Sequence, residues 1–98
     1  MRLAVVHVGH PEQARTLAGW LKGDVMEHSD ALTRAFREYE GIVAIMAMGI
    51  VVRKIAPLVH DKWVDPAVVV VTPDLRFCIP VLGGHHGGNE IARTLAGH

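Results

Sequence analysis

The sequence predicts a small α/β domain in which helices cover both faces of a mixed, mainly parallel sheet. Short apolar runs rich in β-branched residues alternate with segments whose apolar residues recur at helical spacing. One of these runs, between Gly41 and Gly49, is too apolar for a strand with one solvent face, which is typical of a parallel strand covered on both sides. A chain of 98 residues can build one core but not two. We therefore expect a single domain over residues 1–98.

The first half of the chain predicts two strand–helix units. The run "LAVVHVG" predicts a central strand, and Pro11 begins a helix because its fixed φ and missing N–H suit a first turn. Gly23 would end this helix, "DVMEH" predicts a short second strand, and Ser29 is a suitable N-cap for the next helix. The buried residues of the two helices follow helical spacing: Ala14, Leu17, Ala18, Leu21, Leu32, Ala35, Phe36 and Tyr39.

The second half continues this alternation and then reverses direction. The run between Gly41 and Gly49 predicts a strand buried on both faces, and a short helix is expected over Ile50–Ala56 despite its β-branched residues. The segments "AVVVVT" and "RFCIPVL" are separated by too few residues for a parallel crossover, so they predict an antiparallel hairpin. A last helix with one buried face is expected from the helical spacing of Ile91, Ala92, Leu95 and Ala96. These elements predict a three-layer fold of the Rossmann or flavodoxin type with about five strands.

Composition excludes several classes of partner. Ten basic and ten acidic side chains balance exactly when histidine is neutral, which argues against a nucleic-acid partner. No apolar run approaches the roughly 18 residues of a membrane span, and the N-terminus does not resemble a signal peptide. Cys78 is the single cysteine, which suits a reducing compartment, and its apolar neighbours predict a buried small hydrophobe. We therefore expect a cytoplasmic protein without a membrane partner.

The stretch "LGGHHGGNE" lies between the last strand and the last helix. Its glycines let the backbone approach a ligand, and a helix N-terminus offers N–H donors to an anion. Asn89 is a suitable N-cap, with Glu90 in the first turn. A glycine-rich turn with solvated histidines is an equally good interpretation. A metal site at His85 and His86 is less favoured, because adjacent side chains usually diverge. Further ligands would have to come from other histidines: His7, His10, His28 or His60.

A second group of polar residues precedes the fourth strand. Arg53 and Lys54 interrupt an apolar helix, so they either extend to solvent or, for Arg53, bind a carboxylate with two hydrogen bonds. The loop "HDKWVD" is either solvated or an acid–base cluster. His7 lies inside an apolar strand and is expected to be a core residue. His10 follows that strand and is the better candidate, because α/β sheets bind ligands outside the carboxyl ends of their strands.

Two stretches, "MAMGIVVRKIAPLVHDKWVDPAVVVV" and "FCIPVLGGHHGGNEIARTLA", together resemble a known family. They are similar to the N-terminal domain of the cobalamin-biosynthesis CbiG family, the cobalt-precorrin-5A hydrolases. The resemblance covers about Gly41–Ala96. Gly83 replaces the serine typical of the family, and the alanine before Asn89 is missing, so the loop is one residue shorter. The downstream domains of the family are absent from this chain, which is expected to be a stand-alone domain, a fragment or one part of a split enzyme.

The resemblance implies that the δ-lactone of cobalt-precorrin-5A is opened with loss of acetaldehyde. Cobalt would belong to the tetrapyrrole substrate, so neither a cofactor nor a protein-bound metal is expected. His85 is the expected catalytic base. Companion CbiG domains or a second copy of the chain are the expected partners. The expected substrate-binding residues are Gly49, Arg53, Lys62, Gly84, Gly87, Gly88, Asn89 and Glu90.

Two alternatives to an enzyme remain open from the sequence. The chain could be a non-catalytic module for tetrapyrrole binding or assembly, or a protein that handles cobalt through its histidines.

The expected topology determines whether the two motif regions can share one site. A right-handed crossover makes the fourth strand parallel to the third, and the hairpin reverses the fifth. The "GGHHGG" segment is then expected at the sheet edge opposite Gly49 and Arg53, unless the "HDKWVD" loop carries the chain back across.

Overall fold

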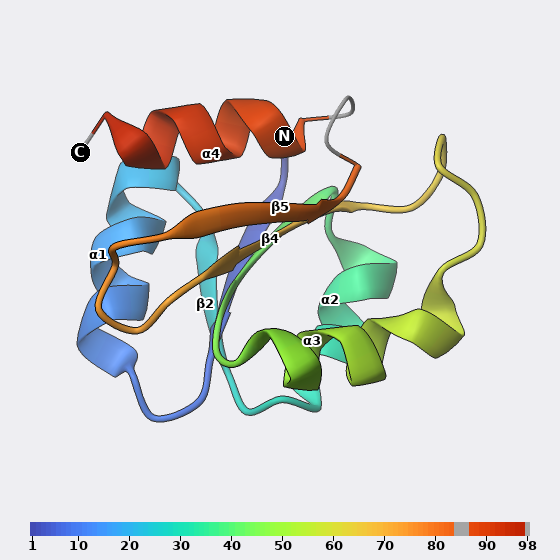
Figure 1. Cartoon of the computed structure of the whole chain (residues 1–98), viewed down its shortest axis with the longest axis horizontal. Helices are drawn as coiled ribbons and strands as arrows, with labels where there is room; N and C mark the ends of the chain where they lie inside the picture. Colours follow the sequence, from blue (N-terminus) through green and yellow to red (C-terminus); the bar gives the residue numbers. More distant parts are fainter. Residues whose placement is uncertain (84–86, 98) are drawn as a thin grey trace.

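The sheet has five strands in the order β2-β1-β3-β4-β5 (Figure 1). The structure is a computed structural model, and it describes residues 1–83 and 87–97. β1 to β4 are parallel, and β5 is antiparallel to β4. The predicted mixed, mainly parallel sheet with a terminal hairpin is therefore confirmed. The strands are β1 (Leu3–His7), β2 (Asp24–Glu27), β3 (Gly41–Ile45), β4 (Ala67–Val71) and β5 (Cys78–Leu82).

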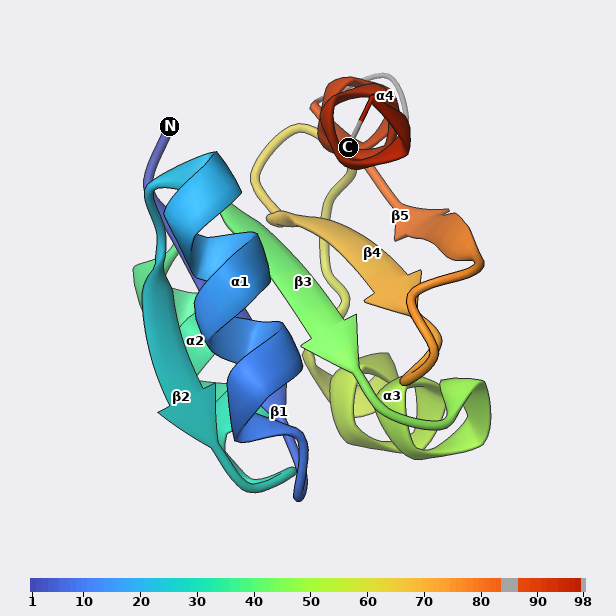
Figure 2. The same ribbon diagram turned by 90° about the vertical axis from the view of Figure 1, so that its left-hand side faces the viewer.

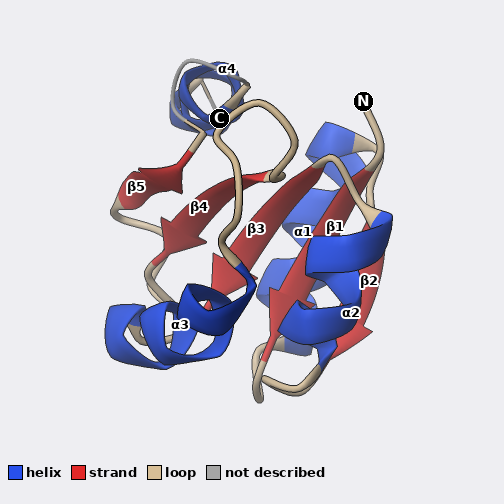
Figure 3. Ribbon diagram, turned by 90° about the vertical axis from the view of Figure 1, so that its right-hand side faces the viewer, coloured by secondary structure: helices blue, strands red, loops and turns tan. Residues whose placement is uncertain are grey.

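Helices cover both faces of this sheet, as Figures 2 and 3 show from opposite sides. The helices α1 (Pro11–Leu21) and α4 (Gly88–Ala96) pack on one face. The helices α2 (Ala31–Glu38) and α3 (Met48–Ile55) pack on the other, and the short 3-10 helix η1 (Ala56–Leu58) continues α3. Alternate residues of β1, β3 and β4 enter the two cores: in β1, Ala4 and Val6 face α2, whereas Leu3 and Val5 face α1. This explains why β1, β3 and β4 are apolar and buried along their whole length.

Several predicted ends of helices and strands are wrong by one to four residues. β3 ends at Ile45 and α3 begins at Met48, so Gly49 lies in the first turn of a helix rather than at the end of a strand. Ser29 is not the N-cap of α2, which is Asp30. Asn89 is not the N-cap of α4 either. The N-cap of α4 is Gly87. Its φ is 115°, a conformation that only glycine adopts without strain.

Gly23 is not the residue that turns the chain after α1. Lys22 adopts the left-handed conformation there, with a φ of 56°. Gly23 is instead required by close packing, since a Cβ at this position would lie 2.9 Å from the carbonyl oxygen of Leu3. Sequence reasoning thus found the turn but assigned glycine the wrong role in it.

The topology defines two edges of the sheet. The edge at which β1 to β4 end is called the carboxyl edge. It carries residues 8–10, 28–30, 46–47 and 72–77. The amino edge is the opposite one, where these strands begin, and it carries residues 59–66, Gly83 and Gly87. β1 lies between β2 and β3, so the chain order reverses at its carboxyl end, the usual location of ligand sites in open α/β sheets.

Candidate functional site

His7 ends β1 at the carboxyl edge and is a buried core residue, as predicted. Its side chain is 3% exposed, and its Nδ1 accepts a hydrogen bond of 3.1 Å from the backbone N–H of His10. Its Nε2 lies 3.9 Å from Oε2 of Glu27. Because Nδ1 is an acceptor, the proton of the neutral ring belongs on Nε2, facing this carboxylate. His7 thereby holds the loop that leads into α1.

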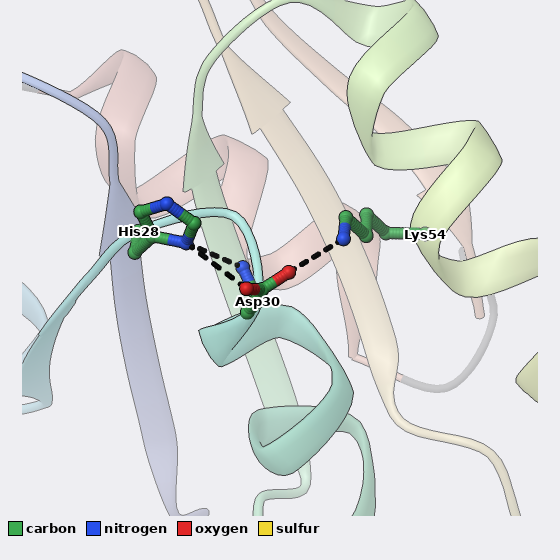
Figure 4. Close-up of polar contacts among 3 residues, drawn as sticks. All are labelled: His28, Asp30 and Lys54. Carbon is green, nitrogen blue, oxygen red and sulfur yellow. Dashed lines mark hydrogen bonds and ion pairs between the residues drawn. The ribbon is translucent and has the colours of Figure 1, made fainter.

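A network at the same edge joins β2, α2 and α3 (Figure 4). Lys54 Nζ lies 2.6 Å from Oδ1 of Asp30, whose backbone N–H donates to Nδ1 of His28 at 3.2 Å. The hydrogen bond from Lys54, followed by its charge, lowers the pKa of the Asp30 carboxyl group. His28 itself has a φ of 87°, an uncommon conformation for a residue other than glycine. Sequence reasoning did not identify this pair, because its members are 24 residues apart.

Gly49 and Arg53 lie one helical turn apart on the exposed side of α3. A Cβ at Gly49 would be 3.9 Å from Nη1 of Arg53, so the guanidinium extends back over the first turn of the helix. Arg53 is exposed and makes no ion pair with an acidic residue in the described part of the chain. The guanidinium is therefore available to an anion near the carboxyl edge.

The loop that precedes β4 is organised by Asp65. Its carboxylate is buried, and Oδ2 accepts hydrogen bonds from the backbone N–H groups of His60 and Asp61 at 2.7 and 3.0 Å. Asp61 in turn accepts from the N–H of Trp63 at 2.7 Å. Lys62 is exposed at the tip of this loop, with Nζ 5.2 Å from the centre of the Trp63 ring. The two aspartates thus shape the loop, which presents Lys62 at the amino edge.

The described glycines after β5 pack tightly at the amino edge. Gly83 has a φ of 67°, and a Cβ there would lie 3.0 Å from Cα of Ala67. The N–H of Gly88 donates to the carbonyl of Gly83 at 3.1 Å. The expected backbone donor at Gly88 is therefore already used inside the loop. Gly84, His85 and His86 lie outside the described residues. The catalytic role of His85 therefore stays a prediction.

The expected substrate-binding residues do not gather in one place. Gly49 and Arg53 lie toward the carboxyl edge with the rest of α3, and the loop after η1 carries the chain back to the start of β4 (Figure 3). Lys62 belongs to the amino edge, where α4 begins (Figure 1). Within the described residues, the remaining members of the set are also at that edge, in the cap and first turn of α4: Gly87, Gly88, Asn89 and Glu90.

Residues 30–98 match a family described as cobalamin synthesis G, N-terminal. The chain belongs to this family. The matched segment begins just before α2 and includes both motif regions that the sequence singled out, so the predicted resemblance to CbiG is confirmed.

Two curated relatives of this CbiG-family chain are cobalt-precorrin-5A hydrolases. The protein of Priestia megaterium is 47% identical over 66 residues, which are 66% of this chain. The protein of Salmonella typhimurium is 49% identical over 65 residues, or 65% of this chain. In both cases the match spans 18% of the relative's own length. The similarity therefore concerns one N-terminal portion of a longer enzyme.

A solved structure extends the family likeness to the whole fold. A cobalamin biosynthesis protein G homologue from Sulfolobus solfataricus matches 97% of this chain with a TM-score of 0.83 and 27% identity, and the match covers 33% of that chain. This structural match therefore includes β1, α1 and β2, which precede the family match over residues 30–98.

Two searches of the described residues bear on membranes and metals. Across residues 1–83 and 87–97, no helix is long and apolar enough to cross a bilayer. In the same part of the chain, no three His, Cys, Asp or Glu side chains are grouped as ligands for a metal ion.

Proposed function

We propose that this chain serves cobalamin biosynthesis as the N-terminal part of a cobalt-precorrin-5A hydrolase. The observation that carries the proposal is the family match over residues 30–98, together with 47% and 49% identity to two such hydrolases. Because the matched region is 18% of each relative, the remaining parts of the enzyme would come from companion domains.

The proposed reaction has two steps. Water adds to the lactone carbonyl and the acyl C–O bond breaks, leaving a carboxylate and a free hydroxyl. The hydroxyl then loses its proton, the bond between its carbon and the macrocycle breaks, and the macrocycle carbon takes up a proton as acetaldehyde leaves. The first step needs a base for water and donors for the carbonyl oxygen, and the second needs an acid–base partner.

We assign the base to His85, the histidine that corresponds to the family motif. The substrate carries many carboxylates, for which guanidinium and ammonium groups are suitable partners. Arg53 and Lys62 are exposed and offer such groups at opposite edges of the sheet. They would therefore contact different parts of the macrocycle or of the assembled enzyme, and not one small pocket within this domain.

A second candidate is a non-catalytic module that holds the tetrapyrrole for a catalytic partner. It is favoured by the short match, since 18% of an enzyme seldom contains a complete active site. In this case the residues of the amino edge would bind substrate or partner without taking part in proton transfer. A cobalt-handling role through histidines has no comparable support among the described residues.

Acetaldehyde release separates these functions. The purified chain is incubated with cobalt-precorrin-5A, alone and with the remaining domains of a family hydrolase, and acetaldehyde is measured. We expect release in the complemented reaction, loss of at least about a hundredfold for His85→Ala, and little change for the neighbouring His86→Ala. Binding by the chain alone, with release that requires the remaining domains and is unchanged by His85→Ala, would favour the non-catalytic module. Full activity of His85→Ala would remove the assigned base.

A further inference from the structure

A groove lies between α1, α4 and the β4–β5 hairpin, on the face of the sheet opposite α2 and α3. Its volume is about 610 Å³, within the range of roughly 300–1,000 Å³ that is usual for small-molecule sites. Figure 2 shows α1 and α4 on this face, with β3 and β4 between them. The lining residues come from all three elements: Leu17, Trp20, Val71, Leu75, Arg76, Cys78, Asn89, Ala92, Arg93, Leu95 and Ala96.

The chemistry of the groove is amphipathic and cationic. Leu17, Val71 and Leu95 contribute apolar surface, and Arg76 and Arg93 are the cationic residues of the lining, with Cζ of Arg76 5.8 Å from the centre of the Phe77 ring. Among the described residues, the lining contains no carboxylate, and no acidic side chain forms an ion pair with either arginine. Two cations beside apolar surface favour a ligand with an apolar body and more than one carboxylate.

The wall that carries Arg76 is held in place by its own hydrogen bonds. Asp74 accepts from the hydroxyl of Thr72 at 2.7 Å and from the N–H of Arg76 at 3.0 Å, and these bonds lower the pKa of the Asp74 carboxyl group. The N–H of Leu75 donates to the carbonyl of Thr72 at 2.8 Å, and Gln13 of α1 donates to the carbonyl of Pro73 at 3.3 Å. The hairpin is thereby tied both to itself and to α1.

We propose that this groove binds the carboxylate-bearing rim of a tetrapyrrole, with Arg76 and Arg93 holding two carboxylates. The nature of the ligand rests on the proposed function, whereas the groove and its cations do not. Asn89 connects the groove to the family's glycine–histidine motif, because it lines the cavity and also lies in the first turn of α4. A substrate held here would extend along α4 toward the amino edge.

Uroporphyrin is a suitable probe, because it is a metal-free tetrapyrrole with many carboxylates, and its binding is followed by fluorescence anisotropy. We expect Arg76→Gln and Arg93→Gln each to weaken binding about tenfold. Arg37→Gln is the matched control, since Arg37 is an exposed arginine of α2 on the opposite face. Ala92→Phe fills the groove without removing charge and should weaken binding more than tenfold. Circular dichroism and thermal unfolding establish that each variant is folded.

Cys78 reports on occupancy of the groove, because it is the only cysteine and lines the cavity. Burial raises the pKa of its thiol, so alkylation by iodoacetamide is slow and easily timed. Bound uroporphyrin should slow alkylation several-fold in the wild type and not in Ala92→Phe. No binding, equal weakening by Arg37→Gln, or alkylation unchanged by the probe would overturn the proposal.

The acetaldehyde assay separates this inference from the proposed function. If the complemented enzyme is active and the Arg76→Gln/Arg93→Gln double variant keeps its KM, the groove is not the substrate site and the hydrolase assignment stands. If uroporphyrin binds as described but the complemented enzyme releases no acetaldehyde, the groove is a tetrapyrrole-binding site and the hydrolase assignment fails. A raised KM with little change in kcat supports both.

Discussion

β3 and β5 are strands of one sheet with opposite surroundings. Every residue of β3 is buried, because helices cover both of its faces and strands flank both sides. β5 is an edge strand whose central residues Ile79 and Pro80 are exposed, and its pairing with β4 shifts between Val68 and Val69. Proline is tolerated there because an edge strand has an unpaired side.

The helix that follows β5 is equally lightly packed. Within α4 the buried residues are Gly88 and Ile91, whereas β1, β3 and β4 are buried throughout. This lightly packed part, β5 and α4, nevertheless contains the family's glycine motif and one wall of the groove. The three fully buried strands β1, β3 and β4 therefore contribute most of the buried apolar surface, and we expect the stability of the domain to depend less on β5 and α4.

The largest expected effect compares one isoleucine from each strand. Ile42→Ala in β3 removes a side chain that is 0% exposed and should lower the free energy of unfolding by about 2–5 kcal/mol. Ile79→Ala in β5 removes one that is 42% exposed and should cost less than about 1 kcal/mol. Urea unfolding followed by circular dichroism measures both. Equal losses would mean that β5 is covered in solution, for example by a second copy.

An intermediate effect concerns the backbone that joins β5 to α4. Gly83→Ala places a Cβ 3.0 Å from Cα of Ala67 at a φ of 67°, so we expect a loss of roughly 1–3 kcal/mol. Gly19→Ala in α1 is the control, because a Cβ there meets nothing within 4 Å and alanine is the better helix former, by up to about 1 kcal/mol. The two changes should thus shift the thermal midpoint in opposite directions. A neutral Gly83→Ala would contradict the tight packing at the amino edge.

The sequence predicts the buried half of the molecule better than the lightly packed half. Leu32, Ala35, Phe36 and Tyr39 are all buried as expected, because helical periodicity directly reflects which side of a helix faces the core. The start of α4 was misplaced because it depends on the backbone conformation of Gly87. Residue type alone does not specify that conformation, since glycine adopts many.

The candidate site was predictable only in part. Family motifs single out the glycine stretch and Arg53, and the strand order places them apart, as the topology argument anticipated. The groove could not be foreseen, because Leu75 and Arg76 meet Arg93 only after the hairpin and α4 have packed against α1. Long-range contacts of this kind leave no periodic signal in the sequence.

The smallest expected effect lies at the carboxyl edge, far from α4. Lys54 lowers the pKa of Asp30 through a hydrogen bond and its charge, so Lys54→Met should raise that pKa toward its ordinary value of 3.8. A carboxyl group whose pKa is lowered by folding stabilises the folded state above its unfolded pKa, and this contribution is lost as the pH falls through the folded value. The wild type should therefore lose a small increment of stability on acidification below about pH 4, and the variant should lose less, because the charge of His28 still lowers the pKa of Asp30.

Carbon-13 NMR titration of the Asp30 carboxyl group measures this difference directly. Arg53→Gln is the matched control, because it removes a neighbouring cation of α3 that makes no ion pair with Asp30. If Arg53→Gln raised the pKa as much as Lys54→Met, the general positive charge of α3 would be responsible, and not the 2.6 Å contact. Because Asp30 is largely exposed and Lys54 is partly exposed, salt should weaken the effect, and repeating the titration at high ionic strength separates the charge contribution from the hydrogen bond.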